Sequence, residues 1–149
     1  MRWRRLMRFE SEYEVRYSET DAMGIVYHAN YFSWFDAGRT RLLQAVGFPY
    51  KQCEDLGYFA PVIHAEIDYG TPFTYGETAV LVTRVSKVTP VKITYSYEIY
   101  DINDDREVVK PRITGATVHC LVDRATFRPV STKKVLPELY QIYKEIEEA

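Results

Sequence analysis

The sequence predicts an α+β domain in which an antiparallel sheet wraps around one long α-helix. The first observation is an apolar stripe at helical spacing that begins near Asn30 and ends before Gly47. The second is a series of long segments rich in β-branched and aromatic residues at 78–88, 91–100 and 108–122. Because the connections between these segments are short, neighbouring strands are expected to run antiparallel. A helix with so many apolar residues must pack against another element, and we expect the strands to form the sheet that covers it.

Composition indicates one globular domain. The 149 residues are 46% hydrophobic and 15% aromatic, with 13 Tyr, which favours a sheet-rich fold with a sizeable core. We expect a single domain over residues 1–149, with residues 1–7 as a candidate flexible N-terminal extension. The net charge of −2 comes from mixed charges along the chain, which argues against nucleic acid or an anionic membrane as a partner.

The two cysteines predict neither a metal site nor a disulfide framework. Cys53 and Cys120 lie far apart, and neither has a second ligand pair beside it. The basic start of the chain is followed by a charged alternating run, which does not fit a secretion signal. Because the start does not fit a secretion signal and no apolar run approaches the length of a membrane span, we expect a cytoplasmic protein. From the cysteine pattern we expect no metal site.

The elements that precede the long strands follow from local patterns. Alternating apolar and charged residues over 9–17 predict a first strand with one buried face. Asn30 is a good N-cap for the long helix, and Gly47 ends it. Gly38 within that helix costs about 1 kcal/mol relative to Ala, which indicates a close approach of backbone or ligand. Residues 50–56 predict a short helix or an irregular lid that borders the substrate.

The remaining elements are a further strand and a closing helix. Residues 61–69 alternate again, and the polar face of this strand carries His64 and Glu66. These two side chains could form an acid and base pair, but a solvated polar face is the better interpretation. His119 is interpreted as an ordinary strand residue, and residues 136–146 predict an amphipathic C-terminal helix.

The stretch with the clearest chemical content joins the first strand to the long helix and reads YSETDAMGIVYHANY over residues 17–31. Asp21 lies in a loop that turns at Gly24, and the helix opens near His28. The first backbone N–H groups of a helix have no partner within it and carry partial positive charge, so they can stabilise an oxyanion. A nearby carboxylate can activate water or attack a carbonyl. The alternative is that Asp21 only caps the helix or forms the turn.

This stretch resembles the signature of a known enzyme family, the hotdog-fold acyl-CoA thioesterases of the 4-hydroxybenzoyl-CoA thioesterase type. The resemblance is strongest to the branch associated with the Tol-Pal system, and it extends along nearly the whole chain. The matching residues are Tyr17, Thr20, Asp21, Gly24, Val26, Tyr27, His28, Asn30, Tyr31, Phe35 and Arg39, and further along Asp68, Tyr69, Pro72, Leu121, Val122 and Asp123.

The resemblance implies a fold, a site and an assembly. The fold is the hotdog, in which the sheet wraps the central helix. Asp21 matches the catalytic carboxylate, and the backbone N–H at the position of His28 helps to polarise the thioester carbonyl. In the family two subunits pair strands edge to edge, with the active site at their interface, so a homodimer or a homotetramer built as a dimer of dimers is expected. We expect the other residues of the stretch to contact the substrate, namely Tyr17, Thr20, Gly24, Tyr27, Asn30 and Tyr31.

The expected function is hydrolysis of acyl-CoA thioesters, with Asp21 as general base or nucleophile and the N–H at His28 in the oxyanion hole. No separate cofactor is expected, because coenzyme A is part of the substrate. One alternative is a silent acyl-CoA binder or scaffold protein, which gains nothing from a carboxylate aimed at the thioester. A less favoured alternative is a hotdog dehydratase, whose motif of a His with an acidic partner is not found. The sequence leaves open the acyl group, the role of Asp21 and the residues that bind the coenzyme A phosphates.

Overall fold

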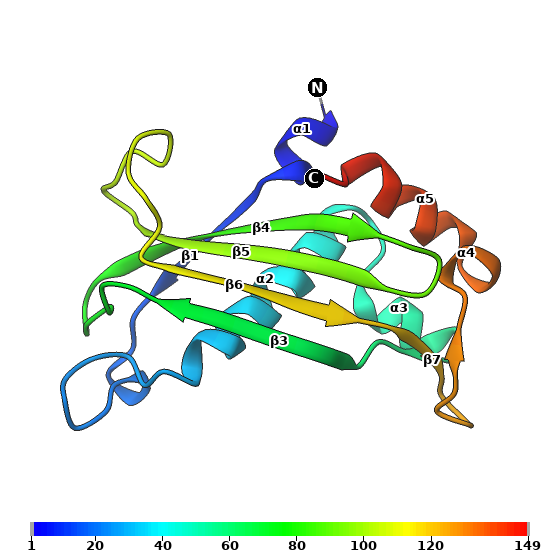
Figure 1. Cartoon of the computed structure of the whole chain (residues 1–149), viewed down its shortest axis with the longest axis horizontal. Coiled ribbons are helices and arrows are strands. Elements are labelled where there is room, and N and C mark those ends of the chain that lie inside the picture. Colours follow the sequence, from blue (N-terminus) through cyan, green and yellow to red (C-terminus); the bar gives the residue numbers. More distant parts are fainter. Residues whose placement is uncertain (1, 149) are drawn as a thin grey trace.

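The fold is an antiparallel sheet curved around one long helix, which confirms the expected α+β hotdog architecture. The computed structural model describes residues 2–148. Five strands form the main sheet in the order β1-β4-β5-β6-β3, and helix α2 (Asn30–Ala45) crosses one face of it, as Figure 1 shows. All neighbouring strands of this sheet pair antiparallel. The strands are β1 (Phe9–Glu14), β3 (Val62–Tyr69), β4 (Thr78–Val88), β5 (Ile93–Asp101) and β6 (Ile113–His119).

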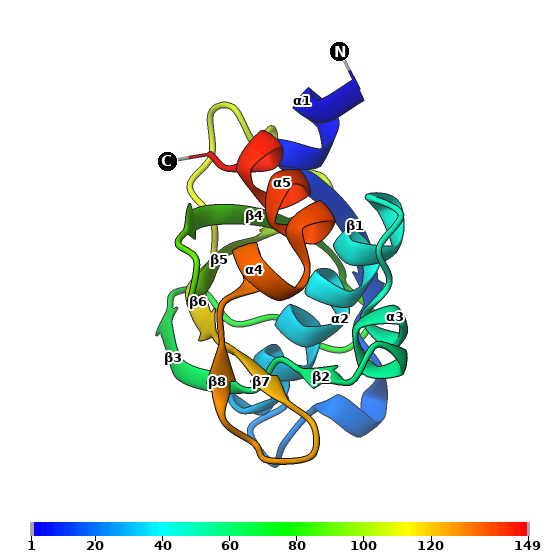
Figure 2. The same ribbon diagram turned by 90° about the vertical axis from the view of Figure 1, so that its right-hand side faces the viewer.

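A smaller sheet and short helices close one end of the molecule. Its strand order is β2-β7-β8, and Figure 2 shows it below the C-terminal helices, with α3 beside it. The strands are β2 (Tyr58–Phe59), β7 (Leu121–Asp123) and β8 (Pro129–Val130). The helices are α1 (Arg2–Met7), the 3-10 turn η1 (Tyr17–Glu19), α3 (Tyr50–Asp55), α4 (Thr132–Val135) and α5 (Pro137–Ile146).

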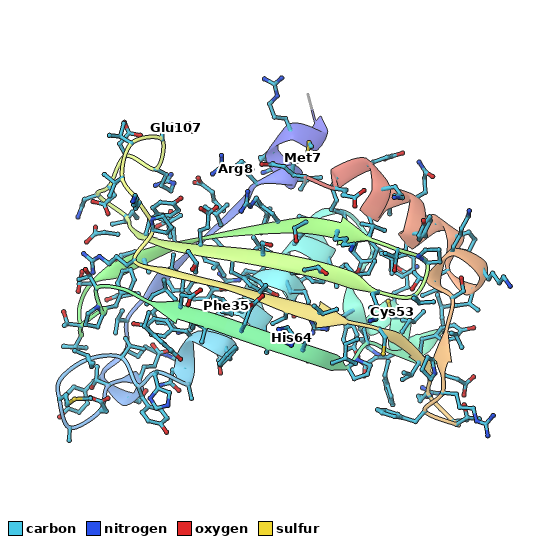
Figure 3. All side chains as sticks on the ribbon, viewed as in Figure 1. Met7, Arg8, Phe35, Cys53, His64 and Glu107 are labelled. Carbon is cyan, nitrogen blue, oxygen red and sulfur yellow. The ribbon has the colours of Figure 1, made fainter. Side chains whose placement is uncertain are left out.

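The core lies between α2 and the inner face of the main sheet. Phe35 on α2 is fully buried under the middle of the sheet, and its ring stacks on Tyr97 of β5 at a centroid distance of 4.2 Å (Figure 3). Gly38 on the same helix face lies so close to β4 that a Cβ there would overlap the side chains of Leu81 and Thr83. The predicted close approach at Gly38 is therefore made by strand β4, and the absence of a side chain at Gly38 lets α2 pack closely against the sheet.

Three predicted boundaries are wrong for local reasons. The first strand ends at Glu14 rather than at residue 17, because the chain turns into η1. The strand predicted over 108–122 is β6 and β7, which begin only at Ile113, and the residues before it form a long turn region after β5. Asn30 is not the N-cap of α2; Ala29 occupies that position, and the Asn30 side chain binds the preceding loop instead.

Residues Arg2–Met7, within the predicted N-terminal extension, form the helix α1. Leu6 of α1 is 2% exposed and belongs to the hydrophobic core. Figures 1 and 2 show α1 beside the C-terminal helix α5, so the two ends of the chain cover the same end of the sheet. Among residues 2–148, no helix is both long enough and apolar enough to cross a membrane.

Candidate active site

Asp21 lies in a tight turn between η1 and α2. Its backbone N–H donates to the Ile25 carbonyl at 2.9 Å, and its carbonyl accepts from the Gly24 N–H at 3.0 Å. Gly24 has a φ of +78°, a conformation that favours glycine and closes the turn. The side-chain Oδ1 accepts from the Met23 N–H at 2.9 Å, whereas Oδ2 makes no hydrogen bond or ion pair with residues 2–148. One carboxylate oxygen is thus held and the other is free to react.

Asp21 and His28 line the same cavity of about 270 Å³ at the start of α2. Apolar and aromatic residues make up most of its lining beside Asp21 and His28. Such a cavity suits an acyl group next to a reacting carbonyl. The other lining residues are Met23, Ile25, Val26, Tyr31, Tyr69, Gly70, Pro72 and Ile113.

The backbone around His28 is fixed in a way that leaves N–H groups available. The Tyr27 carbonyl accepts from the Asn30 N–H at 2.8 Å, and the His28 carbonyl accepts from the Tyr69 hydroxyl at 3.0 Å. The N–H groups of His28 and Ala29 have no acceptor among the residues that the structure describes. Because both flanking peptides are anchored through their carbonyls, these N–H groups are held in place as donors for an anion.

The structure divides the predicted site residues into two groups. Asp21, His28 and Tyr31 line the cavity, and Tyr31 also accepts from the Phe73 N–H through its hydroxyl at 3.2 Å. The other predicted residues do not line it. Tyr17 is 77% exposed and packs edge-on against Tyr75, and the Thr20 hydroxyl donates to the Tyr17 carbonyl. Gly24 lies in the turn, and the Tyr27 ring lies 4.5 Å from the His28 ring. The Asn30 side chain donates to the Glu19 carbonyl.

Two residues that support this site were not singled out from the sequence as site residues. Glu19 is 8% exposed, and its carboxylate accepts from the Trp34 indole N–H at 2.7 Å. Tyr69, which in the sequence is only one of the residues that match the family, donates from β3 to the His28 carbonyl. For Tyr69 the signal was its place at the end of a strand, directly before the break at Gly70; for Glu19 the sequence carried no signal.

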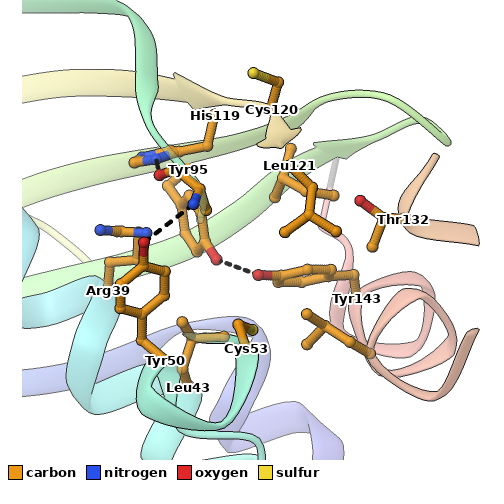
Figure 4. A pocket seen from close by; sticks show the side chains of 13 residues that line it. Arg39, Leu43, Tyr50, Cys53, Tyr95, His119, Cys120, Leu121, Thr132 and Tyr143 are labelled. Carbon is orange, nitrogen blue, oxygen red and sulfur yellow. Dashed lines mark hydrogen bonds between the residues drawn. The ribbon is translucent and has the colours of Figure 1, made fainter. Parts of the chain in front are cut away.

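A second, buried cluster of polar groups lies at the other end of α2 (Figure 4). His119 is 4% exposed, and its pKa is lowered to about 4 by burial and by the nearby charge of Arg39, so the imidazole is neutral. Burial raises the pKa of the Cys53 thiol to about 11, which keeps it protonated and unreactive. The Tyr95 and Tyr143 hydroxyls share a hydrogen bond of 2.7 Å. The His119 ring nitrogens pair with the Ala60 carbonyl and the Thr117 hydroxyl, whereas the buried Arg39 Nε has no hydrogen-bond partner among residues 2–148. His119 is the strand residue that the sequence predicted.

The described residues contain no group of three or more His, Cys, Asp or Glu side chains that could hold a metal ion. His64 and Glu66 are exposed on the edge strand β3 and do not line the cavity beside Asp21; His64 is labelled in Figure 3. The chemistry of the molecule therefore centres on the loop before α2.

Comparison with known proteins identifies the family. Residues 15–140 match the family described as the thioesterase-like superfamily. The chain belongs to this superfamily. A thioesterase-like relative from Bacillus subtilis, named putative acyl-CoA thioesterase YneP, is 39% identical over 136 residues, which are 91% of this chain and 95% of the relative.

Other members of the thioesterase-like superfamily match over similar lengths. Acyl-CoA thioesterase YbgC of Helicobacter pylori is 29% identical over 132 residues, which are 84% of this chain and 94% of that protein. The crystal structure of DHNA-CoA thioesterase from Staphylococcus aureus superimposes with a TM-score of 0.86 at 29% identity, and covers 93% of this chain and 90% of that one. Fold and family agree that the protein is a thioesterase.

Proposed function

We propose that the protein hydrolyses acyl-CoA thioesters to a free acid and coenzyme A, with Asp21 and the start of α2 as the active site. The observation that carries this proposal is that Asp21 shares one cavity with His28, whose backbone N–H has no acceptor within residues 2–148. A free carboxylate oxygen and an unpaired N–H are the groups that acyl transfer needs. Relatives that are named acyl-CoA thioesterases support an acyl-CoA as the substrate.

In the first of two routes, Asp21 acts as a general base. The thioester carbonyl oxygen lies at the His28 N–H. Asp21 takes a proton from water as the water oxygen adds to the carbonyl carbon, and the negative charge that gathers on the carbonyl oxygen is stabilised by the N–H and by the helix dipole. Collapse of this intermediate breaks the C–S bond, releases the acid, and returns the proton to the departing coenzyme A thiolate.

In the second route, the Asp21 carboxylate itself attacks the carbonyl carbon and displaces the thiolate, which leaves an anhydride for water to hydrolyse. Repeated turnover in ¹⁸O-labelled water gives a positive test for the second route. Label in a peptide that contains Asp21 identifies an anhydride that water opens at the Asp21 carbonyl, whereas label in the released acid alone identifies attack of water on the acyl carbon of either the thioester or the anhydride. Neither route uses a separate cofactor.

The test of the function is release of free thiol from a panel of acyl-CoA esters with short, long and aromatic acyl groups. The proposal expects coenzyme A to appear with at least one class. A silent binder would retain acyl-CoA without releasing thiol, and a dehydratase would change the acyl group without releasing thiol. Absence of thiol release across the panel, with a folded protein, would contradict the proposal.

We infer further that the active protein is a homo-oligomer built by pairing the edge strand β3 with β3 of a second copy. β3 ends the sheet, and nearly all of its side chains are exposed, including Val62 at 51% and Ile63 at 48%. An unpaired strand edge with exposed apolar side chains favours pairing with a strand of another subunit. Light scattering is expected to give a dimer or a dimer of dimers at micromolar concentration, and Ile63→Lys to weaken it. A monomer for the unmodified chain would contradict this inference.

The finer assignment is to the 4-hydroxybenzoyl-CoA thioesterase type and its Tol-Pal-associated branch, supported by the motif around Asp21 and His28. A cytoplasmic location is part of the same proposal, because Cys53 and Cys120 are both free thiols, as expected in a reducing compartment. Fractionation of cells that express the tagged protein tests the location.

A further inference from the structure

We propose that Glu19, held by Trp34, is a positioning residue that fixes Asp21 and the His28 N–H relative to each other. This inference rests on the proposed thioesterase function. The Glu19 carboxylate accepts from the Trp34 indole N–H at 2.7 Å and from the Arg16 backbone N–H at 2.9 Å. Glu19 precedes Asp21 by two residues in the same loop, whereas Trp34 belongs to the first turns of α2. The contact therefore ties the loop directly to the helix.

The backbone of Glu19 makes a second connection to the same helix start. Its carbonyl accepts from the Tyr27 backbone N–H at 2.9 Å and from the Asn30 side chain at 2.8 Å. Tyr27 and Asn30 flank His28 on either side. Glu19 thus binds the residue before His28 and the residue two positions after it through its backbone, and it binds the helix through its side chain.

The partner on the helix is itself immobilised. Trp34 is 3% exposed, and its ring stacks on Tyr13 of β1 at a centroid distance of 5.7 Å and also packs against Tyr31 and Phe73. Because these contacts fix the Trp34 ring against the sheet and the helix, its indole N–H holds the Glu19 carboxylate in one place. Tyr31 from this cluster also lines the cavity next to Asp21.

The choice of a carboxylate at this buried position is informative. Burial alone raises the pKa of Glu19, but the hydrogen bonds from Trp34 and Arg16 outweigh it, so the pKa is lowered and the side chain stays ionised. A buried charge is costly unless it is paired, and an apolar side chain would fill the same space without that cost. What the carboxylate adds is directional bonding, which sets the geometry of the loop. Displacement by about 1 Å can cost an enzyme about 100-fold in rate.

The experiment compares Glu19→Gln and Trp34→Phe with the control Glu12→Gln, which changes an exposed side chain of β1 with no hydrogen bond or ion pair among residues 2–148. Gln leaves one acceptor oxygen for the two N–H groups of Trp34 and Arg16, and Phe removes the indole N–H and part of the ring, so each variant weakens the contact between the loop and α2. We expect kcat to fall about 10–100-fold in both variants, with KM changed less than about threefold. Their combined effect should be less than additive, because both remove one interaction.

Hydrogen exchange gives a readout that does not depend on activity. The Tyr27 amide is expected to exchange faster in Glu19→Gln and Trp34→Phe than in the unmodified protein, while amides of β4 and β5 keep their protection. A kcat equal to that of the unmodified protein in both variants would overturn the inference. Loss of amide protection across the whole sheet together with a higher KM would also overturn it, because that pattern indicates a merely structural role. If Glu19→Gln does not fold, Trp34→Phe decides alone. Lack of thioesterase activity in the unmodified protein contradicts the proposed function, whereas normal activity in both variants contradicts only the role of Glu19.

Discussion

The Tyr69 hydroxyl on the edge strand β3 donates a 3.0 Å hydrogen bond to the backbone carbonyl of His28. That carbonyl and the Ala29 N–H belong to one planar peptide, so Tyr69 fixes the direction in which the N–H points. The strand that we propose as the interface between subunits thus also supports the helix start, and pairing of β3 would steady both.

Tyr69→Phe removes this bond and leaves the ring in place. A hydrogen bond of this kind contributes about 1 kcal/mol, so kcat is expected to fall by up to about tenfold, with little change in melting temperature. Steady-state kinetics on the best acyl-CoA ester measures the effect. Tyr140→Phe, whose hydroxyl makes no hydrogen bond with residues 2–148, serves as the control. Equal kinetics for the two variants would show that the bond from Tyr69, which orients the peptide between His28 and Ala29, does not contribute to turnover.

Gly38→Ala tests the close packing of α2 on β4. Ala is the better helix former by about 1 kcal/mol, yet its Cβ would overlap the side chains of Leu81 and Thr83. We expect a net loss of about 1–3 kcal/mol in the free energy of unfolding, measured with urea. Ser33→Ala, at an exposed position of the same helix, should change that free energy by less than about 0.5 kcal/mol. A more stable Gly38→Ala variant would mean that the helix can lift from the sheet without cost.

His119 predicts a dependence of stability on pH. Its pKa is about 4 in the folded protein, lowered by burial and by the charge of Arg39 from α2, and Asp36 opposes this shift only in part. Between about pH 6.5 and pH 4 the unfolded chain binds a proton that the folded protein does not, so stability falls as pH falls through this window. The loss attributable to His119 is about 3 kcal/mol.

Urea unfolding at about pH 7 and about pH 4.5 measures this dependence. His119→Gln keeps polar atoms for the Ala60 carbonyl and the Thr117 hydroxyl, which lie 3.1 Å and 3.0 Å from the ring nitrogens. The variant should lose less stability between the two pH values than the unmodified protein. An identical loss in both proteins would mean that other groups account for the acid sensitivity.

His28→Ala is expected to lower kcat less than removal of the Asp21 carboxylate does. The proposed oxyanion donor is the backbone N–H, which the substitution retains, and the exposed His28 ring packs against Tyr27 and Tyr69. Kinetics of both variants on one substrate makes the comparison. A complete loss of activity in His28→Ala, with Asp21→Asn still active, would reverse the two roles.

Local patterns in the sequence predicted the helices and strands whose residue periodicity is regular. The 3.6-residue periodicity after Asn30 gave α2 its extent, and alternation placed β3 and β4 within a few residues. The late start of β6 was missed because Val108 and Val109 look like strand residues, although they are 79% and 41% exposed in a turn region. Their composition fits a strand, but no strand within residues 2–148 pairs with them, and their N–H groups donate to the Asp105 carbonyl instead.

The site was predicted as a stretch rather than as a set of contacts. Asp21 and His28 share a cavity because a single turn separates them along the chain, and such proximity can be inferred from a motif. The bond between Glu19 and Trp34 spans 15 residues and depends on how α2 packs against the loop. In the sequence, Glu19 looks like the exposed acidic residues of the first strand, so only the packing distinguishes it.

The substitution Asp21→Asn tests the central claim most directly. Asn keeps the oxygen that accepts the Met23 N–H and is as good at a helix or turn position as Asp, so the loop should stay intact. Turnover on acyl-CoA esters and melting temperature are measured on the same preparations. If Asp21 activates water or attacks the thioester, kcat falls by about 10²–10⁴ while acyl-CoA still binds and the melting temperature holds. Hydrolysis at nearly the full rate in a folded Asp21→Asn protein would contradict the mechanism and leave Asp21 as a turn former.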